Sequence, residues 1–188
     1  MIPPHTLDTL EQIFLRALRE TSAGIDAAQI TLERQTAPAP LAQASHLLAL
    51  TLSGYDFRIV VLFDFAVDET TRAFFARQFR RRESLIADEA LPDALSEYVN
   101  MVCGTANRWL ASETRATGMS TPFILQAECK RHIERIAPEQ SLVYRVKARD
   151  LIEFELVLCI CPTQGATLDL APASVQIEEA VGGELELF

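Results

Sequence analysis

The sequence lacks the short motifs that mark the commonest hydrolases. It contains no glycine-rich phosphate loop, no HExxH pair of histidines and no GxSxG turn around a nucleophilic serine. Nucleotide hydrolysis on a phosphate loop, zinc proteolysis and serine-hydrolase chemistry therefore lose their usual signatures. The three histidines, His5, His46 and His132, show no spacing typical of metal ligands, so we expect no metal site.

Cysteines and long apolar runs are also scarce. Four cysteines in 188 residues, Cys103, Cys129, Cys159 and Cys161, are too few and too scattered for a disulfide framework, which fits a reducing compartment. Cys159 and Cys161 fall on one predicted strand, where we interpret them as small apolar residues because a zinc site would need further ligands. No window approaches the roughly 20 apolar residues of a membrane span. The first residues carry neither a basic region nor an apolar signal core, so we expect a cytoplasmic protein.

Basic residues are fewer than acidic ones, 17 against 26, and the formal net charge is -9. Nucleic-acid phosphates would be repelled by such a surface, so we expect no nucleic-acid partner. The only basic cluster comprises Arg77, Arg80, Arg81 and Arg82. These arginines follow a predicted helix, where they would oppose the negative end of its dipole, and a phosphate or partner site is the less favoured interpretation.

What the sequence does contain is runs of strand patterns punctuated by helix patterns. Helical periodicity predicts helices over 6–21, 71–82 and 91–111, and apolar, partly β-branched runs predict strands over 30–33, 46–52, 57–65, 123–129, 141–147 and 154–160. Short turns join the strands as two hairpins, which indicates an α+β fold: a mostly antiparallel sheet with two long helices packed on it. We predict a domain over 1–162 and an acidic C-terminal extension over 163–188.

Two polar stretches have ordinary interpretations at this stage. Asp64 interrupts an apolar strand and is by default a solvent-facing position. Residues 130–140 are polar and are predicted to form a loop or a single turn.

The helix predicted over 91–111 has two distinct faces. At about 100° per residue its bulky apolar residues gather on one side, which we assign to the core. The opposite side carries a polar stripe spaced by three and four residues: Asp93, Glu97, Asn100, Gly104 and Asn107. Gly104 leaves bare backbone where another molecule could approach closely, at a cost of roughly 1 kcal/mol relative to Ala. A surface helix carries an acid and an amide three apart by chance often enough that this spacing alone is weak evidence for a site.

The central helix also resembles a known pattern. Residues 96–106, read as SEYVNMVCGTA, resemble the Glu-x-x-Asn-x-x-x-Gly helix of the CheX/CheC family of chemotaxis phosphatases. The order of the other predicted elements is similar to that of the family over residues 7–162. The match is closer to CheX, which carries a single such helix, because no second Glu-x-x-Asn-x-x-x-Gly stretch occurs.

The resemblance implies a function and a partner. Family members remove the phosphoryl group from the aspartate of a CheY-type response regulator, which itself supplies Mg²⁺, so this chain would bind no cofactor. Asn100 would then orient the attacking water and Glu97 would dock to the regulator's lysine. Asp93, Gly104 and Asn107 would line the contact with the regulator.

Two alternative hypotheses remain open on the sequence alone. A CheX-like domain could bind a response regulator as a scaffold without hydrolysing its phosphoryl group. Alternatively, the fold could be CheX-like while the helix faces something other than a regulator, such as its own partner subunit. Family members of the CheX type pair through sheet edges, so the resemblance implies a homodimer, for which the apolar strand 154–160 is our candidate edge.

Overall fold

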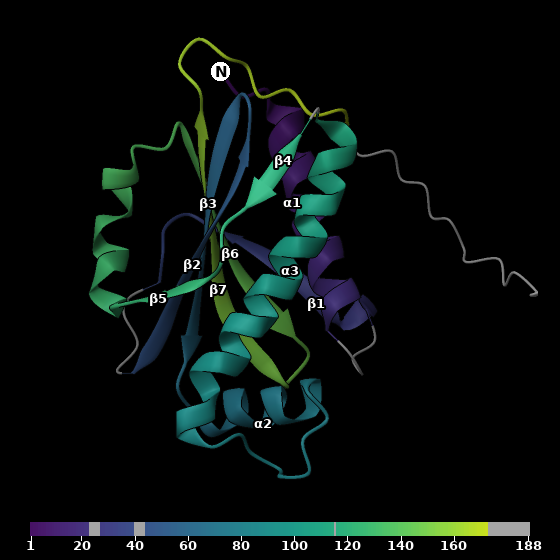
Figure 1. The fold of residues 1–188 in the computed structure, drawn as a ribbon, viewed down its shortest axis with the longest axis vertical. Helices are drawn as coiled ribbons and strands as arrows, with labels where there is room; N and C mark the ends of the chain where they lie inside the picture. Colours follow the sequence, from purple (N-terminus) through teal and green to yellow (C-terminus); the bar gives the residue numbers. More distant parts are fainter. Residues whose placement is uncertain (23–26, 40–43, 115, 173–188) are drawn as a thin grey trace, which may run out of the picture.

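The computed structural model describes residues 1–22, 27–39, 44–114 and 116–172, which form one seven-stranded antiparallel sheet with helices packed on it (Figure 1). The helices are α1 (Pro4–Thr21), α2 (Glu69–Gln78) and α3 (Leu91–Glu113), with 3-10 turns η1 (Ala27–Gln29), η2 (Asp88–Ala90) and η3 (Ala127–Ile136). The strands are β1 (Ile30–Gln35), β2 (Ser45–Gly54), β3 (Phe57–Ala66), β4 (Thr117–Met119), β5 (Phe123–Leu125), β6 (Gln140–Ala148) and β7 (Ile152–Pro162). Their order is β1-β6-β7-β3-β2-β4, with β5 also paired to β2. The predicted α+β architecture is confirmed.

The sheet buries side chains on both faces. Because successive residues of a strand point to opposite sides, Leu47 and Leu48 of β2 belong to different clusters. Leu48 joins the large core between the sheet and helices α1, α2 and α3. Leu47 joins a smaller cluster with Val157 and Ile133, which η3 covers from the other side. Within the described residues, no helix combines the length and apolarity needed to cross a membrane.

An aromatic cluster joins α2 and α3 to the sheet. The ring of Phe75 in α2 meets that of Phe65 in β3 edge-on at a centroid distance of 5.6 Å, and it meets Tyr98 of α3 at 5.3 Å. Asp68 caps the N-terminus of α2, because its Oδ1 accepts the backbone N–H of Thr71 at 2.7 Å. The cluster therefore holds α3 at a defined rotation above the sheet.

The region after α3 differs from the sequence-based prediction. The strand predicted over 123–129 ends at Leu125, and the expected loop over 130–140 is largely the helical segment η3. Lys130 and Ile133 lie three apart on its buried side, so packing on the sheet, rather than apolar content, decides its structure. β4 is absent from the sequence-based prediction, because three residues around Gly118 carry too little pattern to identify a strand.

The expected extension over 163–188 begins inside the folded body. Leu168 and Leu170 are buried in the large core, and the backbone N–H of Leu170 donates to Thr6 Oγ1 of α1 at 3.1 Å. Residues 163–172 therefore pack with the domain. The glutamates that make the extension acidic lie outside the described residues.

The choice of 154–160 as a dimer edge is wrong. These residues belong to β7, which pairs with β3 on one side and with β6 on the other. A strand that reads as nearly continuous apolar sequence is buried on both faces, and such a strand lies inside the sheet rather than at its edge. β1 lies at one edge of the sheet, and β4 and β5 lie at the other.

Candidate functional site

The polar stripe lies on α3, which crosses one face of the sheet (Figure 1). Pro92 stands in its first turn, where the missing amide hydrogen has no intrahelical acceptor to lose. The buried residues recur at helical spacing along one side: Leu91, Ala94, Leu95, Tyr98, Val99, Val102, Cys103, Thr105, Ala106 and Leu110. The opposite side is left for solvent or for another molecule.

Glu97 and Asn100 share that open side, as the sequence predicted. Glu97 is exposed and Asn100 is partly exposed. In the described part of the chain neither side chain has a hydrogen-bond or ion-pair partner, and no polar atom of Asn100 is buried. Tyr98 between them is 1% exposed and anchored in the core. The two side chains therefore project together from a helix whose rotation is held by its buried face.

Gly104, one turn beyond Asn100, has no packing reason to be glycine. A Cβ built there would lie 3.9 Å from Met119 Sδ and 4.0 Å from its Cε, which is ordinary van der Waals contact. Its backbone has ordinary helical geometry, since the positive-φ residues of the chain lie elsewhere. Alanine would fit and would favour the helix by about 1 kcal/mol. Nothing among the described residues accounts for the glycine, whereas close approach by another molecule would.

Asp93 and Asn107, at the two ends of the stripe, interact with their own chain. Asp93 is exposed in the first turn of α3, where a carboxylate is stabilised by the helix dipole. Asn107 is only partly exposed, and its Oδ1 is buried without a hydrogen-bond partner. Its backbone carbonyl accepts a hydrogen bond from Thr117 Oγ1 of β4 at 3.4 Å. The stripe is therefore open at Asp93, Glu97 and Asn100 and becomes covered toward Asn107.

The basic cluster divides at the end of α2. Arg77 lies in the last helical turn, where the predicted dipole interaction applies. Arg80, Arg81 and Arg82 follow the helix and are exposed, and Arg80 has a positive φ of 50°. The helix dipole therefore accounts for Arg77 but not for the three arginines beyond it.

The prediction that Asp64 faces solvent is wrong. Its side chain is 10% exposed and its Oδ2 accepts a hydrogen bond from Lys130 Nζ at 2.7 Å. The same ammonium lies 2.7 Å from Glu155 Oε1, and Glu155 Oε2 accepts the backbone N–H of Ala39 at 2.5 Å. Burial alone would lower the pKa of Lys130, but the two carboxylates together raise it above its ordinary value. The three charges fasten η3 to the sheet, which no local sequence pattern reveals.

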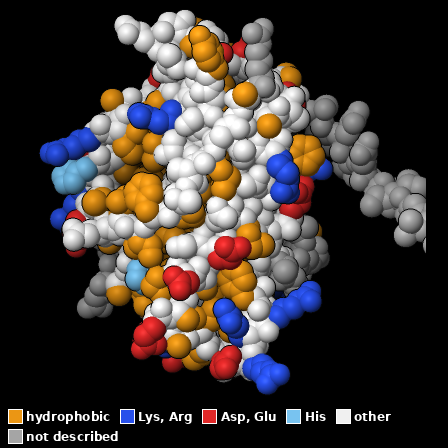
Figure 2. Space-filling view, viewed as in Figure 1, with side chains coloured by type: hydrophobic (Ala, Val, Ile, Leu, Met, Phe, Trp, Pro, Cys, Tyr) orange, Lys and Arg blue, Asp and Glu red, His pale blue; other side chains and the backbone are white. Residues whose placement is uncertain are grey.

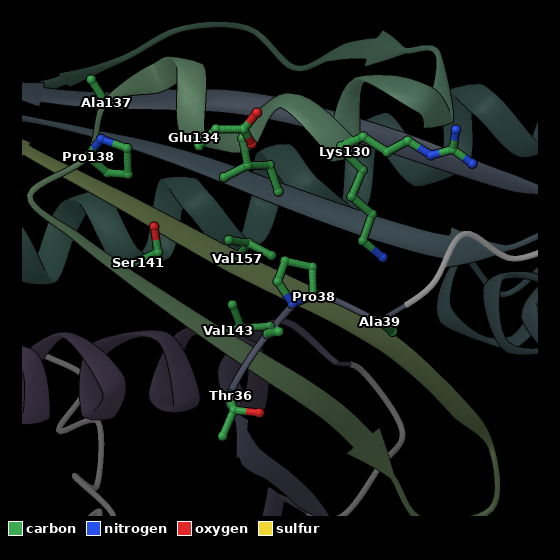
Figure 3. Close-up of a pocket in the computed structure, with 13 residues that line it drawn as sticks. Thr36, Pro38, Ala39, Lys130, Glu134, Ala137, Pro138, Ser141, Val143 and Val157 are labelled. Atoms are coloured by element: carbon green, nitrogen blue, oxygen red, sulfur yellow. The ribbon is translucent and has the colours of Figure 1, made fainter.

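A cavity of about 770 Å³ lies beside these charges, on the face of the sheet opposite α3. Figure 3 shows Val143 and Val157 on its floor, Pro38 at its side and Lys130 reaching down from η3. None of the five residues of the polar stripe lines it. Within the described residues, no three His, Cys, Asp or Glu side chains gather in a way that could hold a metal ion. The cavity is therefore separate from the predicted site.

Comparison with known proteins finds the fold but no sequence relative. No protein-family model matches the chain, and no curated protein matches it. The chemotaxis protein CheX from Vibrio vulnificus superposes with a TM-score of 0.59 at 16% identity, covering 81% of this chain and 99% of that one. A putative chemotaxis protein from Desulfovibrio vulgaris Hildenborough gives 0.57 at 16% identity, covering 81% and 96%. A CheX-CheY-BeF3-Mg²⁺ complex from Borrelia burgdorferi gives 0.56 at 13% identity, covering 82% and 97%. The chain therefore has the CheX-like fold.

Proposed function

We propose that this protein dephosphorylates the phospho-aspartate of a CheY-type response regulator. The observation that carries the proposal is the placement of Glu97 and Asn100, which stand side by side on the open face of α3 without a partner in the described chain. Two further facts support it. The fold is CheX-like, and one structure similar to this chain is a CheX complex with CheY, BeF3 and Mg²⁺.

In the proposed chemistry, the main task of this chain is to position the attacking water. In hydrolysis of an acyl phosphate, water attacks phosphorus, the bond to the aspartate oxygen breaks, and inorganic phosphate leaves with the proton that water releases. The regulator supplies Mg²⁺ and a lysine, so an oriented water is the missing part. Asn100 can hold that water through its amide without bringing negative charge toward the phosphoryl group, whereas a carboxylate would be repelled.

Glu97 has the complementary role. Its carboxylate pairs with the regulator's lysine and fixes the angle at which α3 docks. Because Glu97 and Asn100 are three residues apart, one rigid helix face delivers both to the same pocket. Asp93 and Gly104 extend this contact surface, and Asn107 contributes at its covered end.

The decisive experiment is single-turnover dephosphorylation of phosphorylated receiver domains from the same genome, with Mg²⁺ present. We expect acceleration by the wild-type protein, a loss of about 100-fold or more with Asn100→Ala, and weaker binding with Glu97→Gln. Glu113→Gln, at an exposed position near the end of the same helix, is the matched control and should retain activity. Full activity in Asn100→Ala would refute the proposed role of this residue.

The alternative is a scaffold that binds the regulator without hydrolysis. The same exposed helix face would serve it, so geometry alone does not separate the two functions. A receiver that binds tightly but loses its phosphoryl group only at the uncatalysed rate would favour the scaffold.

A homodimer remains a prediction, now with a different edge. Since β7 is interior, pairing would have to use β1 or the β4 and β5 side of the sheet. Sedimentation velocity would give the oligomeric state. A dimer that protects Glu97 and Asn100 from solvent would count against the phosphatase proposal.

A further inference from the structure

Met101 is an exposed apolar side chain in the middle of the polar stripe. It is 38% exposed and belongs to neither buried cluster. On α3 it lies four residues after Glu97 and three before Gly104, so it neighbours both on the same open face. A large apolar side chain beside an acid and a glycine is thus left outside the buried clusters of the described chain.

A second apolar side chain flanks the stripe from the sheet. Ile124 of β5 is 43% exposed. It pairs with Leu48 of β2, which points into the core beneath the helices, so Ile124 also lies on the α3 side of the sheet. β4 pairs with the other end of β2, and its Met119 lies beside Gly104. Figure 2 shows this face of the molecule with hydrophobic side chains among acidic ones.

We infer that Met101 is an apolar anchor that packs against the response regulator next to its phosphorylation pocket, with Ile124 of β5 as a weaker contact. The inference rests on the proposed function, because its surface is continuous with the Glu97 and Asn100 pair. Apolar contacts around a polar centre exclude water and strengthen the charged interactions inside. A methionine suits this place because its flexible, polarizable side chain adapts to a partner's surface.

An anchor of this kind acts on binding and leaves chemistry unchanged. Contacts made equally in the bound state and in the transition state alter KM with little change in kcat. Asn100, by contrast, acts on the attacking water and therefore on kcat. The split between the two constants distinguishes an anchor from a catalytic residue.

The test measures kcat and KM for a phosphorylated receiver with the full chain and four variants. We expect Met101→Lys to raise KM by about tenfold or more at unchanged kcat, Ile124→Ser to raise it by about two- to fivefold, and Met101→Leu to stay near wild type. Tyr55→Lys, at a 91% exposed aromatic in the turn between β2 and β3, is the matched control and should change neither constant. Circular dichroism verifies that each variant is folded.

The outcomes separate this inference from the function on which it rests. If Asn100→Ala abolishes turnover while Met101→Lys leaves KM unchanged, the anchor is refuted and the phosphatase stands. If the wild type binds a receiver without hydrolysis and Met101→Lys abolishes that binding, the anchor stands and the phosphatase does not. If no receiver is bound at all, both are overturned.

Discussion

The hydroxyl of Tyr98 lies 3.0 Å from Ser22 Oγ, in a buried contact between α3 and the end of α1. Ser22 caps α1, and Tyr98 follows Glu97 directly, so the hydrogen bond ties the candidate site to a helix at its back. Rotation of α3 would have to break this bond and expose the ring. The direction in which Glu97 and Asn100 point is therefore a consequence of what Tyr98 contacts.

Tyr98→Phe should destabilise the protein at neutral pH. The substitution leaves Ser22, which is 4% exposed, without its partner, and a buried unsatisfied hydroxyl costs about 1–2 kcal/mol. Urea unfolding followed by circular dichroism would measure the free energy of unfolding. An unchanged free energy would show that water replaces the phenol.

The same variant should be less sensitive to alkali. Burial raises the pKa of Tyr98 to about 12, against the smaller lowering effect of the Ser22 hydrogen bond. The folded pKa lies above the unfolded value of about 10. The contribution of the neutral phenol of Tyr98 to the free energy of unfolding is therefore present below pH 10 and is lost as pH rises through about 12. Each pKa unit corresponds to about 1.4 kcal/mol. The free energies of unfolding of the wild type and of Tyr98→Phe should differ at pH 9 and converge at pH 11.5. An equal loss of stability in both proteins between these pH values would contradict the assignment.

Gly104→Ala should separate stability from function. Since a Cβ fits beside Met119, the helix should gain about 0.5–1 kcal/mol in unfolding free energy. We expect weaker binding of a phosphorylated receiver, because the added methyl group stands where the partner approaches. Ala111→Gly, at an exposed position of the same helix, should show the reverse change in stability without affecting binding. A stabilised variant with wild-type affinity would remove the close-approach role.

Lys130→Met should be strongly destabilising. It would leave Asp64 and Glu155 as buried carboxylates with side chains 10% and 9% exposed and no cation between them, at a cost of about 3–5 kcal/mol. Lys147→Met removes an exposed ion pair to Glu33 and should cost less than about 1 kcal/mol. Thermal denaturation of both variants gives the comparison. Equal losses would mean that the charge cluster does not fasten η3.

Thiol reactivity should follow burial. Cys129 is exposed and should react quickly with a disulfide reagent in the native protein. Burial raises the pKa of Cys103, and it raises that of Cys159 to about 11, so both thiols should react only after unfolding. Mass spectrometry after brief labelling would identify the modified residue. Rapid labelling of Cys103 would show that the core beneath α3 opens.

Patterns within single elements were sufficient to predict the main features of the fold and which side chains α3 exposes, whereas the choice of Glu97 and Asn100 as a site came from the family resemblance. The 3.6-residue period of α3 separates Leu95, Val99 and Val102 from Glu97 and Asn100, and that division does not depend on what α3 packs against. Two apolar hairpins with short turns likewise predict antiparallel pairing. The same local reasoning failed for Asp64, whose partner Lys130 lies 66 residues away.

The sequence by itself determined which residues share a face of each helix and strand, because helix and strand periods are properties of the local backbone. Only the tertiary structure decided that β7 lies inside the sheet, that η3 covers its second face, and that Asp64 meets Lys130 in the interior. These features depend on contacts between distant segments. Such contacts are selected by the total area and charge they bury, and no short window of sequence contains that information.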